Sequence, residues 1–72
     1  MLELPKEWTL TRCEAQVLHL AADGLTNAAI AERLGVSVHV VKFHLAGVYR
    51  KLGVPNRTSA ASAYLRAAGS GQ

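Results

Sequence analysis

The fold is decided by residues 35–53, which read GVSVHVVKFHLAGVYRKLG. A glycine stands at each end, and Ser37 can cap a helix because its hydroxyl can accept a hydrogen bond from a free backbone amide. The spacing predicts a helix over 38–52. One face of this helix is apolar and repeats at i, i+4, i+7 and i+11, through Val41, Leu45, Val48 and Leu52. We expect this face to pack into the core.

A second face of the same helix is polar and cationic and carries one aromatic residue. It consists of His39, Lys42, Phe43, Ala46 and Arg50. A helix fits the major groove of B-DNA, where base edges differ in their donors, acceptors and methyl groups. Lys42 can donate to guanine, Phe43 can lie against a thymine methyl, and Arg50 and Lys51 suit phosphates. Solvated surface charges beside an ordinary exposed aromatic residue would give the same pattern, so the helix alone leaves both interpretations open.

Two further helices are predicted before this segment. Residues 11–14 match a capping box, in which the hydroxyl of the first residue and the carboxylate of the fourth each accept from the other's backbone amide. An apolar stripe follows, and Gly24 is typical of a helix end. Thr26 can then cap a short helix over 27–34.

Gly53 ends the third helix and Pro55 prevents a restart nearby, so a fourth helix is predicted from Thr58 to about residue 68. We expect Ala61 and Leu65 to close the core from this helix. Four helices with tight turns, the second one short, predict an all-α fold with a helix-turn-helix layout.

The predicted organisation has three parts. Residues 1–9 form an N-terminal extension, residues 10–68 the helix-turn-helix domain, and residues 69–72 a flexible tail that is rich in glycine.

Charge is divided unevenly along the chain. The first 32 residues hold five acidic and two basic residues, whereas residues 33–72 hold six basic residues and no acidic one. This division favours a basic face for a polyanion such as DNA, although a solvated basic surface has the same composition.

Composition also limits the class of function. A chain of 72 residues has room for one small core and little room for a deep catalytic cleft. It has no apolar run long enough for a membrane span and no secretory leader, and Cys13 has no cysteine to pair with, so we expect a cytoplasmic protein. The sequence has no recognised metal-ligand spacing, no glycine-rich phosphate-binding loop and no paired carboxylate motif. Cys13 and a histidine remain open as a nucleophile pair, but nothing else in the sequence supports one, so we expect no metal, no cofactor and no enzymatic activity.

Two runs of residues match the motifs of a known family between Leu10 and Ala63. The first consists of Leu10, Thr11, Arg12, Glu14, Val17, Leu18, Gly24, Leu25, Asn27, Ile30 and Ala31. The second and more specific one consists of Val41, Lys42, His44, Leu45, Tyr49, Lys51, Leu52, Gly53, Val54, Arg57 and Thr58. On these residues the sequence resembles the LuxR-type helix-turn-helix family, the DNA-binding output domain of quorum-sensing and two-component response regulators.

The resemblance implies a DNA-binding mode. The third helix would enter the major groove, with base edges facing Lys42, Phe43 and Ala46. Phosphate contacts are implied for Asn27, Ser37, Lys51, Arg57 and Thr58, and His39 and Arg50 join them from the polar face of the third helix. Two copies would pair on DNA through the fourth helix, and we expect that contact at Ala60, Ala63, Tyr64 and Ala67.

Some positions depart from the family. Ala28 and Ala29 replace a usual Lys-Glu pair, and Ala46 offers a base no hydrogen bond. The main hypothesis is a homodimeric regulator of transcription that binds double-stranded DNA. The alternative is a protein-interaction module of the same fold that contacts RNA polymerase or another regulator.

Overall fold

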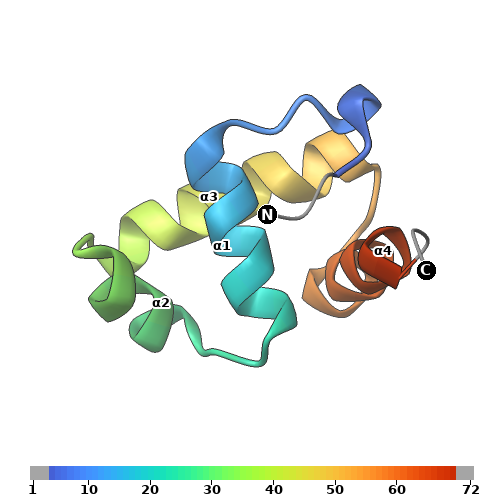
Figure 1. Cartoon of the computed structure of the whole chain (residues 1–72). Helices are drawn as coiled ribbons and strands as arrows, with labels where there is room; N and C mark the ends of the chain where they lie inside the picture. Colours follow the sequence, from blue (N-terminus) through green and yellow to red (C-terminus); the bar gives the residue numbers. More distant parts are fainter. Residues whose placement is uncertain (1–3, 70–72) are drawn as a thin grey trace.

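The computed structural model describes residues 4–69, and over this range the chain is helical with no strand (Figure 1). A short 3-10 helix precedes four α-helices: η1 (Lys6–Trp8), α1 (Arg12–Ala22), α2 (Asn27–Leu34), α3 (Val38–Leu52) and α4 (Arg57–Gly69). The predicted all-α class with four helices is confirmed, and the predicted bounds of α2 and α3 agree with the structure to the residue.

Side-chain caps begin the first three α-helices. Thr11 and Glu14 form the predicted capping box, with Thr11 Oγ1 accepting from the Glu14 amide at 3.1 Å and Glu14 Oε1 accepting from the Thr11 amide at 2.9 Å. The hydroxyls of Thr26 and Ser37 accept from the amides of Ala29 and Val40, each at 3.1 Å. Because these amides have no partner within their helices, the caps fix where each helix begins.

The turn between α2 and α3 is formed by three residues and depends on Gly35. This glycine has a φ of 72°, in the left-handed region that side chains disfavour. The amides of Gly35 and Val36 donate back to the carbonyls of Glu32 and Ala31, at 3.4 and 3.0 Å. The turn therefore closes α2 and directs α3 across the molecule.

The core has two parts, which share α1 and α3. One lies among α1, α2 and α3 and contains Val17, Leu20, Ala21, Ile30, Ala31, Val41 and Leu45. The other lies among α1, α3 and α4 and contains Leu18, Val48, Ala60 and Tyr64. Leu4 and Trp8, from the predicted N-terminal extension, pack against this second part.

Helix α4 begins and packs differently from the prediction. It begins at Arg57, one residue before the predicted start at Thr58, and Asn56 Oδ1 caps it by accepting from the Ser59 amide at 2.9 Å. The expected core contacts of Ala61 and Leu65 are also wrong: Ala61 is half-buried and Leu65 is 56% exposed.

Tyr64 explains why α4 buries a different face from the predicted one. Its ring is 5% exposed and fills the space beside α1, while its hydroxyl lies 2.6 Å from Nδ1 of His19. A tyrosine is well suited to this position, because its ring is apolar and its hydroxyl can reach a partner near the surface. Of the predicted tail, Gly69 ends α4, and residues 70–72 lie outside the described residues.

Candidate nucleic-acid interface

Helix α3 presents its polar face to solvent. Val41, Leu45 and Val48 are buried, whereas the other face is exposed and carries His39, Lys42, Phe43, Ala46 and Arg50. In Figure 1, α2 lies beside the N-terminal part of α3 and α4 beside its C-terminal end. The structure thus brings the predicted base-facing residues together on one open surface.

Phe43 is the most exposed large apolar side chain in the described part of the chain, at 72%. Its only ring contact there is with the neighbouring His44, edge-on, with ring centroids 5.6 Å apart. Val36 and Val38, at the start of α3, are also exposed. This end of the domain therefore offers apolar contacts together with cationic ones.

Lys51 does not share the outward orientation of Arg50. Its ammonium donates to Glu14 Oε1 at 2.7 Å and to the carbonyl of Thr9 at 3.2 Å. A phosphate contact was predicted for Lys51. In the structure its ammonium instead has two hydrogen-bond acceptors within the protein.

Glu14 is a buried acid, 7% exposed. Burial alone would raise the pKa of its carboxyl, but hydrogen bonds from Lys51 and Thr11 outweigh burial, and the pKa lies below its ordinary value. The carboxylate is therefore held in its charged form.

Gly47 makes room for that carboxylate. A Cβ added to Gly47 would lie 2.5 Å from Glu14 Oε2, closer than real contacts allow. Gly47 was not among the predicted site residues. The feature of the sequence that indicates it is a glycine in the middle of a helix, where glycine costs about 1 kcal/mol relative to alanine.

Arg57 and Asn27 were both predicted to contact phosphates, and the structure brings them together. Arg57 Nη1 donates to Asn27 Oδ1 at 2.7 Å, and Nη2 donates to the carbonyl of Leu25. The start of α4 is thereby joined to the start of α2. Because Arg57 occupies Oδ1, the amide NH2 of Asn27 remains to donate elsewhere.

Two other predicted phosphate contacts lie at helix starts. Ser37 and Thr58 are exposed, and Ser37 Oγ already accepts from the Val40 amide. A serine hydroxyl that accepts this bond can still donate its own hydrogen to a phosphate.

The residues predicted to pair two copies do not share one surface. Ala60 and Tyr64 are 1% and 5% exposed and belong to the core, so their assignment to a dimer contact is corrected. Ala63 and Ala67 are half-buried, and Leu65 is the large apolar side chain that α4 exposes. The cause is again Tyr64, because its buried ring turns the face of α4 that carries Ala60 towards the core.

Residues 4–69 hold neither a metal-binding cluster nor a membrane-spanning helix. No cluster of three or more His, Cys, Asp or Glu side chains suited to a metal occurs there. No helix in this range has the length and apolar character needed to span a bilayer.

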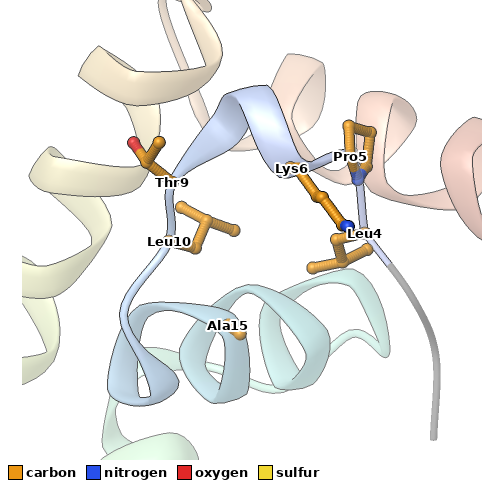
Figure 2. Close-up of a pocket in the computed structure, with 6 residues that line it drawn as sticks. All are labelled: Leu4, Pro5, Lys6, Thr9, Leu10 and Ala15. Carbon is orange, nitrogen blue, oxygen red and sulfur yellow. The ribbon is translucent and has the colours of Figure 1, made fainter.

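A groove of about 310 Å³ lies between the N-terminal arm, residues 4–10, and α1. Figure 2 shows the residues that line it: Leu4, Pro5, Lys6, Thr9, Leu10 and Ala15. This lining is mixed, with polar and apolar groups, and has none of the residues of the exposed face of α3.

An exposed cationic helix, held by a tight turn against a shorter one, defines a helix-turn-helix domain. The sequence profile described as "Bacterial regulatory proteins, luxR family" matches residues 8–64. The chain therefore belongs to the LuxR family of bacterial regulatory proteins, and the predicted family is confirmed.

Three relatives illustrate the similarity. "Probable transcriptional regulatory protein SgaR" of Hyphomicrobium methylovorum is 44% identical over 79% of this chain and 27% of that protein. "Transcriptional regulatory protein LiaR" of Bacillus subtilis is 43% identical over 81% of this chain and 27% of that protein. "Nitrate/nitrite response regulator protein NarP" of Escherichia coli is 42% identical over 83% of this chain and 28% of that protein.

The chain spans about a quarter of the length of these relatives. No solved structure matches it closely enough for comparison. Family membership and the relatives indicate DNA-binding regulation of transcription, a class that is not enzymatic in general.

Proposed function

We propose that the chain binds double-stranded DNA with α3 in the major groove. The observation that carries the proposal is the exposed face of α3, which is cationic and free of acids and lies opposite a buried apolar stripe. On this face Lys42 would donate to guanine, Phe43 would contact a thymine methyl, and Ala46 would allow the helix to approach the bases closely. Because the proposed target is chromosomal DNA, the proposed compartment is the cytoplasm.

Phosphate contacts would position the domain on the duplex. We assign them to Asn27, Ser37, His39, Arg50 and Thr58. Arg57 would contribute by orienting the Asn27 amide as well as by its charge. These groups flank the exposed face of α3 at the starts of α2, α3 and α4 and at the C-terminal end of α3.

Lys42→Ala tests the placement of α3. After selection of a preferred duplex from a random pool, the variant should lose about 1–3 kcal/mol of binding free energy and relax preference at one or two base pairs. Arg66→Ala is the matched control, because it removes an exposed cation from α4. Equal losses in the two variants, with base preferences unchanged, would contradict the placement.

Two copies would pair on DNA through the outer side of α4. The contact would involve Ala63, Ala67 and the exposed Leu65. These side chains bury little apolar area, so DNA would have to hold the copies close together by raising their effective concentration.

Ala63→Glu tests the pairing, because each introduced carboxylate would face its symmetry mate. Cooperative binding to a two-site duplex should disappear, while binding to a single site persists. Unchanged cooperativity, with the helical circular dichroism spectrum intact, would remove α4 from the contact.

A second candidate is a protein-interaction module that contacts RNA polymerase or another regulator. The exposed apolar group of Phe43, Val36 and Val38 favours it, since a protein partner could also cover these side chains. The dependence of duplex binding on salt concentration distinguishes the two candidate functions. If Arg50 and Arg57 each neutralise one phosphate, log K should fall against log salt with a slope of about −2, whereas the absence of duplex binding would favour the protein partner.

A further inference from the structure

The junction between α1 and the C-terminal end of α3 is built around one ion pair. Lys51 Nζ lies 2.7 Å from Glu14 Oε1, and both side chains are largely withdrawn from solvent, at 25% and 9% exposed. A surface ion pair contributes little to stability, but a buried charge must be matched by a partner and by hydrogen bonds. Glu14 has both, because Oε1 also accepts from the Thr11 amide at 2.9 Å.

Helix α3 is shaped to receive this carboxylate. Gly47 lies one turn before Lys51 on the same side of α3, and Glu14 Oε2 occupies the space that a Gly47 side chain would need. The glycine and the lysine thus contact the two oxygens of one carboxylate. A lysine that extended towards a phosphate would leave this carboxylate buried without its counter-charge.

The N-terminal arm contributes the second acceptor of Lys51. Thr9 has a φ of 49°, which is rare for a β-branched residue, and its carbonyl accepts from Lys51 at 3.2 Å. In Figure 2 the side chains of Leu4 and Leu10 point into the space between the arm and α1, while that of Thr9 points away from it. Lys51 therefore holds the arm as well as α1.

We propose that Lys51 is a positioning residue for α3 whose ammonium stays on Glu14 and the Thr9 carbonyl when DNA is bound, so that it neutralises no phosphate. The inference rests on the proposed function, because it concerns how α3 is held while it lies in the groove. The neighbouring Arg50, which is exposed, supplies the phosphate contact at this end of the helix.

The test compares Lys51→Met with Arg50→Met, two adjacent residues of α3. Binding to the selected duplex and to an unrelated duplex is measured over a range of salt concentrations. Arg50→Met should lower the magnitude of the salt slope by about 0.9 and weaken both duplexes alike. Lys51→Met should leave the slope unchanged and weaken the selected duplex about tenfold, with a smaller loss for the unrelated one.

A drop of about 0.9 in the slope for Lys51→Met would overturn the inference while the proposed function stands. If the wild-type chain binds no duplex, the proposed function fails and this inference fails with it.

Glu14→Gln provides the matched partner variant. Glutamine keeps the length of the side chain and an oxygen for the Thr11 amide, but it removes the charge that holds Lys51. It should reproduce the reduced preference for the selected duplex, and the double variant should be no worse than either single one. Independent, additive losses would show that Lys51 acts elsewhere.

One measurement needs only the wild-type chain, so it stands even if a variant fails to fold. The carbon-13 shift of the Glu14 carboxyl reports its hydrogen bonds, and it should not move when the selected duplex saturates the protein. A clear shift on DNA addition would mean that Lys51 leaves Glu14, which would overturn the inference.

Discussion

Helices α3 and α4 both pack against α1, but they are held in different ways. Helix α3 buries three branched side chains spread over two turns, Val41, Leu45 and Val48, and both parts of the core include it. Helix α4 buries Ala60 and Tyr64 and belongs to one part only. In the core, the placement of α3 therefore depends on three branched side chains, whereas that of α4 depends on one large side chain, Tyr64, together with the bonds from Arg57 to Asn27 and Leu25. Loss of the Tyr64 ring should therefore weaken the packing of α4 more than that of α3.

The largest expected effect comes from Tyr64→Ala. Removing a buried aromatic ring should cost about 3–5 kcal/mol in the free energy of unfolding, because a cavity replaces the contacts with α1 and α3. Leu65→Ala, the next residue, should change stability by about 0.5 kcal/mol or less, since Leu65 is exposed. Urea denaturation followed by circular dichroism measures both.

Tyr64→Phe refines this comparison, because it keeps the ring and removes only the bond to His19, with an expected cost of about 1 kcal/mol. Equal costs for Tyr64→Ala and Leu65→Ala would contradict the packing of α4.

Gly47→Ala should have the next largest effect, on the side of α3. Alanine normally favours a helix over glycine by about 1 kcal/mol. Here the added methyl would meet the Glu14 carboxylate, and overpacking of this kind costs about 1–3 kcal/mol. We expect net destabilisation in thermal unfolding. Gly47→Ala in a Glu14→Ala background should instead be neutral or stabilising, and destabilisation there would contradict the role given to Gly47.

Asn56→Ala should have a smaller effect and tests where α4 begins. Loss of a side-chain cap costs about 1 kcal/mol. Thr58→Ala is the matched control, because the Ser59 amide has its acceptor in Asn56. Greater destabilisation by Thr58→Ala in the same denaturation experiment would contradict the assignment of the cap to Asn56.

The smallest expected effect is a change in pH dependence at the junction of α1 and α3. The pKa of Glu14 is lower in the folded state than its ordinary value, so its contribution to stability is present above that ordinary value and is lost as pH falls through the folded-state pKa. Wild-type stability should therefore fall between pH 6 and pH 3 more steeply than that of Glu14→Gln. Parallel profiles in denaturant titrations would show that Glu14 titrates normally.

Local signals were sufficient for most of the fold. Caps at Thr11, Thr26 and Ser37 and a left-handed glycine after α2 located three helices, because each signal acts within four residues along the chain. The apolar repeat of α3 also predicted its buried face, and the remaining side of the helix is the exposed face that we propose contacts bases. Both predictions follow from helical geometry alone.

The positions that local sequence patterns could not place are those fixed by long-range contacts. The phosphate contact predicted for Lys51 stays a prediction, but its ion-pair partner Glu14 lies 37 positions earlier, and no local pattern connects the two residues. The alanines of α4 gave no clear apolar stripe, so the single tyrosine determined which face is buried. Arg57 finds its acceptors at Leu25 and Asn27, which no periodicity connects to it.

The position of Trp8 makes the N-terminal arm observable by fluorescence. It is the only tryptophan in the sequence, and it packs against the second part of the core, beside the residue whose carbonyl holds Lys51. Its emission will report whether the arm is seated on α1, α3 and α4, without contributions from another indole. An emission change on adding DNA would therefore mean that the arm has moved, while contact at Phe43 alone would leave the signal constant.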